Sequence, residues 1–114
     1  MSRALSFVVL ALSASVVAHA DENGTPGTIS SMRVHTPSAD SFLQYHGRVQ
    51  ITSSQDGRNL QREYRWGGLS CGSRVLEPDE VAMLQQAHIH GFTIKPIWKP
   101  GQGTTRCLVG FDLR

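Results

Sequence analysis

The chain begins with a short apolar segment that is set apart from everything after it. A positively charged start with Arg3 is followed by almost wholly apolar residues from Leu5 to Val17. The small-x-small tripeptide Ala18-His19-Ala20 comes next, and charged residues begin at once with Asp21. This order is typical of a secretory signal peptide over residues 1–20, cleaved after Ala20. A membrane-spanning helix needs about 20 apolar residues, so we expect cleavage and no membrane insertion.

Export limits what the remaining residues, 21–114, can fold into. A chain of this size has only a marginal hydrophobic core, and an oxidising compartment permits disulfides. Both cysteines, Cys71 and Cys107, lie in this part. We therefore expect them to form a disulfide that stabilises the fold by roughly 3–4 kcal/mol. The alternatives are a metal pair or a redox site, but the sequence has no C-x-x-C motif and no clustered Cys/His spacing. The prediction is a periplasmic or secreted bacterial protein.

The charge of the exported part argues against nucleic acid as a partner. The formal net charge is +2, and loss of Arg3 with the signal peptide lowers it to +1. Nucleic-acid-binding domains usually carry a strongly basic patch, which this balance does not supply. The cations are mostly arginine, which suits bidentate contacts with carboxylates or phosphates. A solvated surface that happens to use arginine is the alternative interpretation.

Residues 21–40 differ in composition from the rest. They are rich in Gly, Pro, Ser and Thr and show no sustained periodicity. We predict a flexible N-terminal arm, or an irregular strap on the domain, with room for a short strand at Ile29, Met32 and Val34. The sequence has no internal repeats, so residues 41–114 are expected to form a single β-rich domain.

Two runs alternate between apolar and polar residues, which is the pattern of half-buried strands. The first covers residues 43–52, and Gly47 in the middle of its apolar face indicates a bulge or bend. The second covers residues 59–66, and Asp56-Gly57 between the runs is a turn signal. We expect an antiparallel hairpin whose apolar face carries Leu43, Tyr45, Val49, Ile51, Leu60, Tyr64 and Trp66.

The rest of the chain predicts a short strand, a helix and two further strands. The short strand covers residues 69–75, after Gly67-Gly68. The helix covers residues 78–90, with proline at its first position and Gly91 just past its end. The last strands cover residues 92–99 and 106–113. Because Pro96 lacks an amide hydrogen, we expect the first of these to be an edge strand or to be broken. In the second, we expect Cys107, Val109, Phe111 and Leu113 to face inward.

The order of elements is therefore β-β-β-α-β-β. A single helix between the third and fourth strands is the layout of the OB-fold, a small Greek-key barrel. That fold bends its first strand so that it serves both halves of the barrel, which Gly47 would permit. The fold prediction is a mainly β, OB-like barrel with one helix and one disulfide. The competing architecture is an α+β sheet with the helix on one open face.

The part from the helix to the C-terminus resembles the pentameric B subunits of AB5-type bacterial toxins, which are exported OB-fold proteins with one internal disulfide. Their last elements are a helix, a strand with Trp near its end, a polar loop and a final strand. In the cholera-type members, that Trp and the polar residues after it contact a glycan. The resemblance covers about a third of the chain and implies that Trp98, Lys99 and Gln102 bind a glycan and that the chain forms a homo-oligomeric ring.

The chain departs from the cholera-type pattern in two respects. Cys71 precedes the helix, whereas the cholera-type disulfide starts near the N-terminus. Pro96 and the longer loop at residues 100–103 also differ. Exported bacterial OB-fold proteins that are not toxins share the same layout of elements.

Trp98, Lys99 and Gln102 form the leading candidate site. The flat apolar face of an exposed Trp suits the C–H surface of a sugar, and neighbouring polar groups can bind its hydroxyls. The alternative is that Trp98 packs in the core, as aromatic residues of small domains usually do. Arg65 is a second candidate, because strand alternation turns it away from Tyr64 and Trp66, which we expect to be buried.

The sequence shows no signature of catalysis. It contains no G-x-S-x-G, H-E-x-x-H, P-loop or G-x-G-x-x-G motif. His88 and His90 are two apart on the predicted helix and so do not face each other, and His35 and His46 lie far away in the sequence. We expect no metal site, no cofactor and no enzymatic activity.

These observations predict a non-enzymatic exported binding module that recognises a glycan or another surface ligand through the Trp98 loop. Two other functions remain open. One is a periplasmic inhibitor or immunity protein whose arginine-rich faces meet the acidic cleft of an enzyme. The other is an envelope-stress or structural OB-fold protein without a specific ligand.

Overall fold

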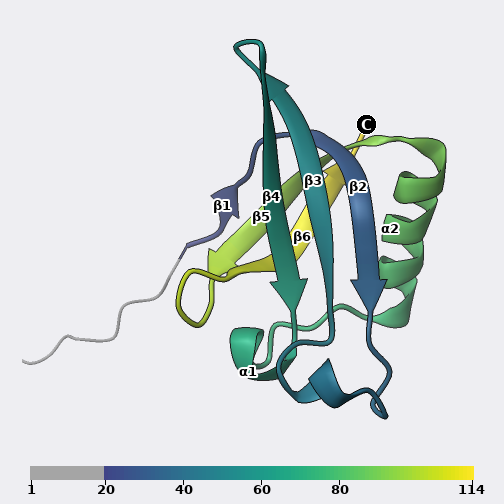
Figure 1. Cartoon of the computed structure of the whole chain (residues 1–114), viewed down its shortest axis with the longest axis vertical. Coiled ribbons are helices and arrows are strands. Elements are labelled where there is room, and N and C mark those ends of the chain that lie inside the picture. The colour runs from purple at the N-terminus through teal and green to yellow at the C-terminus, as the bar shows by residue number, and fades with distance from the viewer. Residues whose placement is uncertain (1–19) are drawn as a thin grey trace, which may run out of the picture.

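A computed structural model describes residues 20–114 as a six-stranded sheet with one long helix (Figure 1). The predicted signal peptide falls on residues 1–20, of which only Ala20 lies among the described residues. The strands are β1 (Glu22–Asn23), β2 (Gly27–Val34), β3 (Gly47–Gln55), β4 (Arg58–Trp66), β5 (Thr93–Pro100) and β6 (Arg106–Leu113). The helices are the 3-10 helix η1 (Asp40–Leu43), α1 (Gly68–Cys71) and α2 (Pro78–His90).

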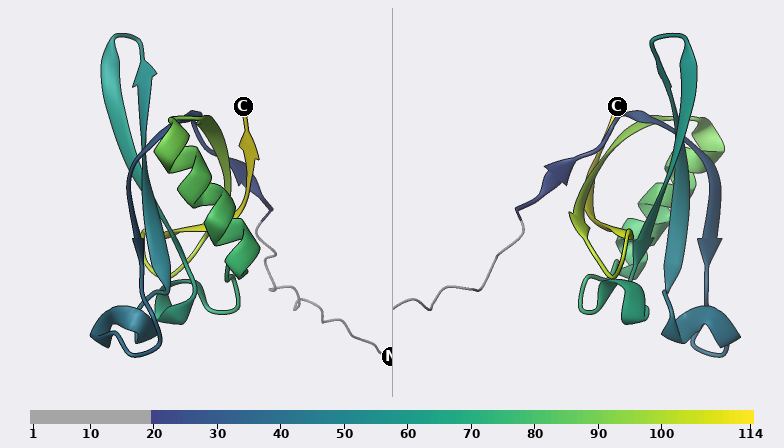
Figure 2. Two further views of the ribbon diagram at one scale, coloured as in Figure 1. Left: turned by 90° about the vertical axis from the view of Figure 1, so that its right-hand side faces the viewer. Right: turned by 60° about the vertical axis from the view of Figure 1, so that its left-hand side comes forward.

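Five of the strands close into a barrel. β2 pairs with β3, and β3 with β4, in antiparallel orientation. β4 then pairs in parallel with β6, β6 pairs with β5, and β5 returns to β2. Figure 2 shows α2 in front of the opening between β2 and β5. This closed circuit confirms the prediction of an OB-like barrel and excludes the open α+β sheet.

The hairpin of β3 and β4 forms as the sequence predicts. The two strands pair from Gly47 with Trp66 to Gln55 with Arg58, which leaves Asp56 and Gly57 as a two-residue turn. Both turn residues have positive φ, 53° and 75°. Positive φ at both central positions defines the type I′ turn that matches the twist of antiparallel strands.

Helix α2 has the predicted bounds, because strong local signals fix both of its ends. Glu77 and Glu80 form a capping box at its start, and Pro78 occupies the first turn. Gly91 ends the helix in the left-handed conformation. Leu84 and Ala87 are its buried residues and face the core. No helix among residues 20–114 is long and apolar enough to cross a membrane.

The core lies inside the barrel and beneath α2. Tyr64 and Trp66 are almost fully buried, as predicted, and both come from β4. Their neighbours in the cluster are aliphatic residues from the other four barrel strands and from the helix. The buried cluster consists of Ile29, Val49, Ile51, Tyr64, Trp66, Leu84, Ala87, Ile94 and Leu108.

Residues 21–40, predicted as a flexible arm or an irregular strap with room for a short strand at Ile29, Met32 and Val34, contain β1 and the first barrel strand, β2. β2 pairs with β3 over nearly its whole length. A register shift between Ile29 and Ser31 interrupts its alternation, so the sequence indicates only a short strand where β2 has eight residues. The irregularity predicted at Gly47 therefore lies in β2 instead. β2 is also the strand that joins the two halves of the barrel, because it pairs with β3 on one side and with β5 on the other.

The segment after β4 is also not a strand as predicted. Gly67 and Gly68 both have positive φ, 72° and 69°, and reverse the chain. Residues 68–71 then form the short helix α1, in which Ser70 and Cys71 are buried. Three barrel strands still precede α2, because β2 takes the place of the predicted third strand.

Three smaller predictions about the other strands need correction. Leu43 lies in η1 and is 76 % exposed, so the strand predicted from residue 43 begins only at Gly47. β5 is not an edge strand, because it pairs with β6 on one side and with β2 and β1 on the other. Pro96 lies between the residues of β5 that pair with β2 and those that pair with β1. A register shift in the β5–β6 pair makes Leu108 a core residue, whereas alternation predicted Val109.

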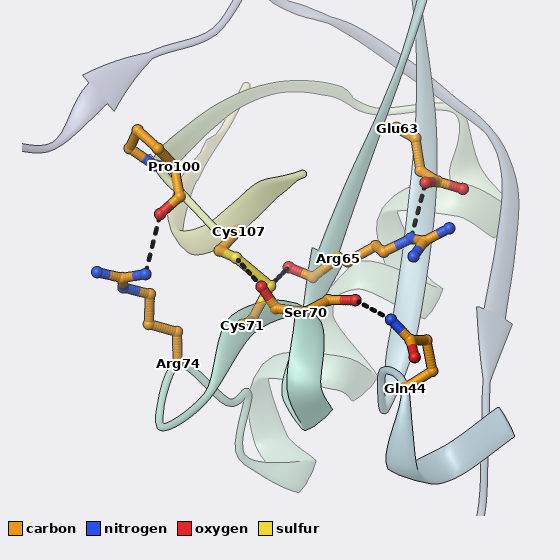
Figure 3. The surroundings of a disulfide bond; sticks show 8 residues. All are labelled: Gln44, Glu63, Arg65, Ser70, Cys71, Arg74, Pro100 and Cys107. Atoms are coloured by element: carbon orange, nitrogen blue, oxygen red, sulfur yellow. Dashed lines mark hydrogen bonds and ion pairs between the residues drawn. A yellow bond between two sulfur atoms is a disulfide. The ribbon is translucent and has the colours of Figure 1, made fainter. Parts of the chain in front are cut away.

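The Cys71–Cys107 disulfide is present, as predicted, and joins α1 to β6 (Figure 3). The two Cα atoms lie 5.6 Å apart, and the cysteines are 36 residues apart in sequence. Next to it lies the only register pair between β4 and β6 in the described residues, Arg65 with Cys107. The disulfide therefore reinforces the barrel at the place where strand pairing is shortest.

Replacing both cysteines, Cys71→Ser with Cys107→Ser, should lower the free energy of unfolding by about 3–4 kcal/mol, because it restores chain freedom to the unfolded state. Urea unfolding of the mature protein measures this loss. A reducing agent should destabilise the unmodified protein by a similar amount and leave the double variant unchanged. A loss below about 1 kcal/mol would show that the seam between β4 and β6, where the barrel closes, does not depend on the disulfide.

Gly47→Ala should destabilise the protein by roughly 1–3 kcal/mol, because a Cβ at this position would overlap the Trp66 ring in a packed core. Gly110→Ala is the matched control in β6. A Cβ there would meet only Ile97 side-chain atoms, the nearest at 3.6 Å, which is ordinary contact. Thermal or urea unfolding of both variants is the measurement, and equal stability of the two would contradict the expected packing.

Candidate ligand-binding site

A surface hollow of about 220 Å³ lies at the end of the β5–β6 hairpin. Trp98 and Pro100 come from β5, and Arg106 from the start of β6. The loop between the strands adds Thr104 and Thr105, and Gly103 completes the lining. The Arg106 guanidinium carbon lies 5.6 Å from the centre of the Trp98 ring. The hollow thus combines a flat aromatic surface with a cation and two hydroxyls.

Trp98 has two kinds of neighbour. It is partly buried and packs against the core cluster, and it also lines the hollow. The two interpretations of Trp98 in the sequence, core packing and an accessible surface, therefore both describe part of this side chain. Core packing on one side fixes the ring, so that the side toward the hollow has a defined position.

The segment after β4 holds the β5–β6 loop in place (Figure 3). The Gln102 amide donates a hydrogen bond of 2.9 Å to the Ser70 carbonyl. An Arg74 guanidinium nitrogen donates one of 3.0 Å to the carbonyl of Pro100, which lines the hollow. The disulfide from Cys71 to β6 adds a covalent link beside them. These contacts tie both ends of the loop to α1 and the residues just after it.

Lys99 and Gln102 do not line the hollow. Successive side chains of a strand point to opposite faces, so Lys99 points away from Trp98. Its Nζ forms an ion pair of 3.4 Å with Asp21, just before β1. Gln102 lies exposed in the loop, where its main chain makes the bond to Ser70. Of the three residues predicted together, the structure therefore places only Trp98 in the hollow.

Arg65 belongs to a different surface, the outer face of β3 and β4. Its Nε donates a hydrogen bond of 2.8 Å to the Glu63 carboxylate, which also pairs with Arg48 at 3.5 Å. The Arg65 guanidinium lies over the Tyr45 ring, 4.2 Å from its centre. Arg65 turns away from the buried Tyr64 and Trp66, as predicted, but it makes internal contacts and does not reach the hollow.

Arg106, Thr104 and Thr105 are the polar lining residues that the sequence analysis missed, and Pro100 and Gly103 also line the hollow without having been predicted. Register pairs Pro100 with Arg106 across the hairpin, and this pairing brings the guanidinium beside Trp98. The sequence offered one signal, the loop from Gly101 to Thr105 between two alternating runs, which implies a hairpin. Counting pairs back from such a loop would have placed Arg106 opposite the end of β5.

A buried phenol lies close to the same guanidinium. Tyr64 is 1 % exposed, and its burial raises its pKa above the ordinary value of 10.0. The positive charges of Arg106 and Arg62 act in the opposite direction, and a hydrogen bond with the Arg62 side chain adds to this. Neither arginine forms a salt bridge within residues 20–114. The hollow is therefore lined by a guanidinium that forms no salt bridge with a carboxylate of the described residues.

The two histidines of α2 make contacts within the chain. His88 Nδ1 lies 2.9 Å from the Ile29 carbonyl oxygen, and His90 Nε2 lies 3.1 Å from Gln86. In the described part of the chain, no group of three or more His, Cys, Asp or Glu side chains is placed to hold a metal ion.

Comparison with protein-family models, with curated proteins and with solved structures gave no match for this chain.

Arg106→Gln should raise the pKa of Tyr64 further, because it removes a positive charge that stabilises the tyrosinate. An absorbance titration at alkaline pH measures this pKa, and Tyr64→Phe identifies its signal against that of Tyr45. Arg114→Gln, at the exposed C-terminus, is the control and should leave the titration unchanged.

The same titration has a consequence for stability. Because the pKa of Tyr64 is raised in the folded state, its contribution to stability is complete below pH 10 and is lost as the pH rises through the folded-state pKa. An unchanged tyrosine titration in Arg106→Gln would show that the charge of Arg106 does not act on Tyr64.

Proposed function

We propose that the mature protein is an exported, non-enzymatic recognition module that binds one sugar residue of a glycan in the Trp98 hollow. The observation that carries the proposal is the half-buried Trp98 ring beside the Arg106 guanidinium and two threonines. A sugar presents an apolar C–H face and a rim of hydroxyls. The Trp98 ring suits the first, and the donors and acceptors around it suit the second.

The size and position of the hollow support a small ligand group. Pockets that enclose drug-sized ligands usually measure roughly 300–1,000 Å³, whereas this hollow measures about 220 Å³. A terminal sugar is the part of a glycan that suits such a volume. The loop between the last two strands is also one of the places where OB-folds bind oligosaccharides.

We propose binding without catalysis because the groups that line the hollow do not include a catalytic acid, base or nucleophile. They are one tryptophan, one proline, one glycine, two threonines and one arginine. None of them is a carboxylic acid, an imidazole or a thiol that could act as general acid, general base or nucleophile near neutral pH. The described cysteines are joined in the disulfide.

Export completes the proposal and rests on the sequence. The N-terminal segment has the order of a signal peptide, and the disulfide is consistent with an oxidising compartment. The periplasm and the cell exterior both contain glycans that a module of this kind could meet.

Trp98→Ala should weaken glycan binding at least about tenfold, which corresponds to about 1.4 kcal/mol, because it removes the stacking surface. Binding of the mature protein to a glycan array, followed by calorimetry with the best ligand, is the measurement. Trp98→Phe should keep part of the affinity. Phe92→Ala, which removes an exposed aromatic residue outside the hollow, is the matched control and should bind normally. A blank array, or full binding by folded Trp98→Ala, would refute the proposal.

A further inference from the structure

One edge of β2 lacks a strand partner over most of its length. β2 pairs with β3 on one side from Thr28 to Val34. On its other side it pairs with β5 only through Gly27 and Thr28. Beyond that point α2 lies beside β2, as Figure 1 and Figure 2 both show. A helix has no free main-chain edge with which to continue the ladder.

A histidine substitutes for a strand at the first position of this edge. His88 of α2 contacts the Ile29 carbonyl through Nδ1, at 2.9 Å. From Ser30 to Val34, no second strand lies against this side of β2 in the part of the chain that the structure describes. About five residues of strand edge are therefore open to an additional partner.

Two hollows, of about 290 and 350 Å³, lie in succession between this edge and α2. Both are lined by Val34 and Gln85, so they are adjacent, and we call the two hollows together the β2–α2 groove. Its principal apolar residues are Met32, Val34, Phe42, Leu76, Val81 and Ile89. The groove follows the length of α2 from its first residue, Pro78, to Ile89.

Most side chains of the groove are exposed or half-buried, although Trp66 is buried, and its titratable side chains are three histidines, His35, His46 and His88. Val34 is 48 % exposed and Ile89 71 %. No Lys, Arg, Asp or Glu lines either hollow. Arg33 alternates with Met32 and Val34 along β2 and therefore points to the other face of the strand. Proteins usually protect an open strand edge with charges or proline, and the β2 residues that line this groove, Met32 and Val34, are neither.

We propose that the β2–α2 groove binds an extended, uncharged, apolar segment of a partner protein, which adds to β2 as a strand. A row of main-chain donors and acceptors is complementary to the main chain of another extended segment. The apolar lining accepts alternate side chains of that segment. A charged side chain in the groove would lose its hydration, and no Lys, Arg, Asp or Glu lines the groove to pair with it, so the lining favours a neutral segment.

The dimensions agree with this occupant. Five residues of strand extend over about 17 Å at 3.3 Å per residue. Helix α2 has 13 residues, which at 1.5 Å per residue is about 20 Å. The open edge and the helix that walls the groove thus have similar lengths. The surface is separate from the Trp98 hollow and shares no lining residue with it.

The test uses the mature protein and a blocked seven-residue peptide in which threonine and valine alternate. Nuclear magnetic resonance titration should show binding with a dissociation constant near or below about 1 mM. The amide signals that shift or gain protection from exchange should lie in residues 30–34 and along α2. The same peptide N-methylated at every residue should fail to bind, because neither of its edges can then donate the ladder hydrogen bonds. A version with aspartate in place of valine should also fail.

Val34→Asp and Ile89→Asp should each weaken peptide binding at least about tenfold, since they place a charge in the groove. Leu43→Asp is the matched control, because Leu43 is an exposed apolar residue outside the groove. Circular dichroism confirms that each variant is folded.

Three results would overturn the proposal: no binding of the peptide, equal binding of the N-methylated peptide, or signal changes that fall at the Trp98 hollow. Light scattering can give a fourth such result. If the protein self-associates and its residues 30–34 are already protected from exchange without peptide, the groove binds a second copy of the chain.

Discussion

The barrel closes at a seam that strand pairing alone holds weakly. β4 and β6 share one register pair, whereas β3 and β4 are paired along their whole length. The Cys71–Cys107 disulfide lies beside that single pair and supplies a covalent link in place of a long ladder. Because such a link restricts the unfolded chain, it favours closure even where few hydrogen bonds form. The β5–β6 hairpin keeps its place in the barrel because β6 is held at this seam.

The same contacts that close the seam also position the candidate site. Ser70 and Cys71 belong to α1, and both contact the end of the hairpin, one through the Gln102 amide and the other through the disulfide. A binding surface on a loop is well defined only where rigid elements support it. In the sequence the cysteines predicted stability alone. In the fold they also determine where Pro100 and the rest of the hollow lie.

Elements with strong local signals could be predicted from the sequence, and elements specified by distant partners could not. The turn at Asp56-Gly57 and the ends of α2 carry their information within a few residues, and both were predicted correctly. β2 becomes a strand through pairing with β3, and its register shift removes the alternation that would have revealed it. The candidate site follows the same rule. Lys99 is adjacent to Trp98 in sequence but points to the other face, whereas Arg106 reaches it across the hairpin.

Both surfaces proposed for recognition lie where strand pairing stops. The β2–α2 groove begins where the β2–β5 ladder ends after Thr28 and a helix replaces the next strand. The hollow lies at the last pair of the β5–β6 hairpin, Pro100 with Arg106, next to the seam with a single β4–β6 pair. Some main-chain and side-chain groups at such places are not used by the fold, so they remain free to bind. A barrel with complete ladders at both seams would gain stability and lose both surfaces, because the same groups cannot serve the fold and a ligand at once.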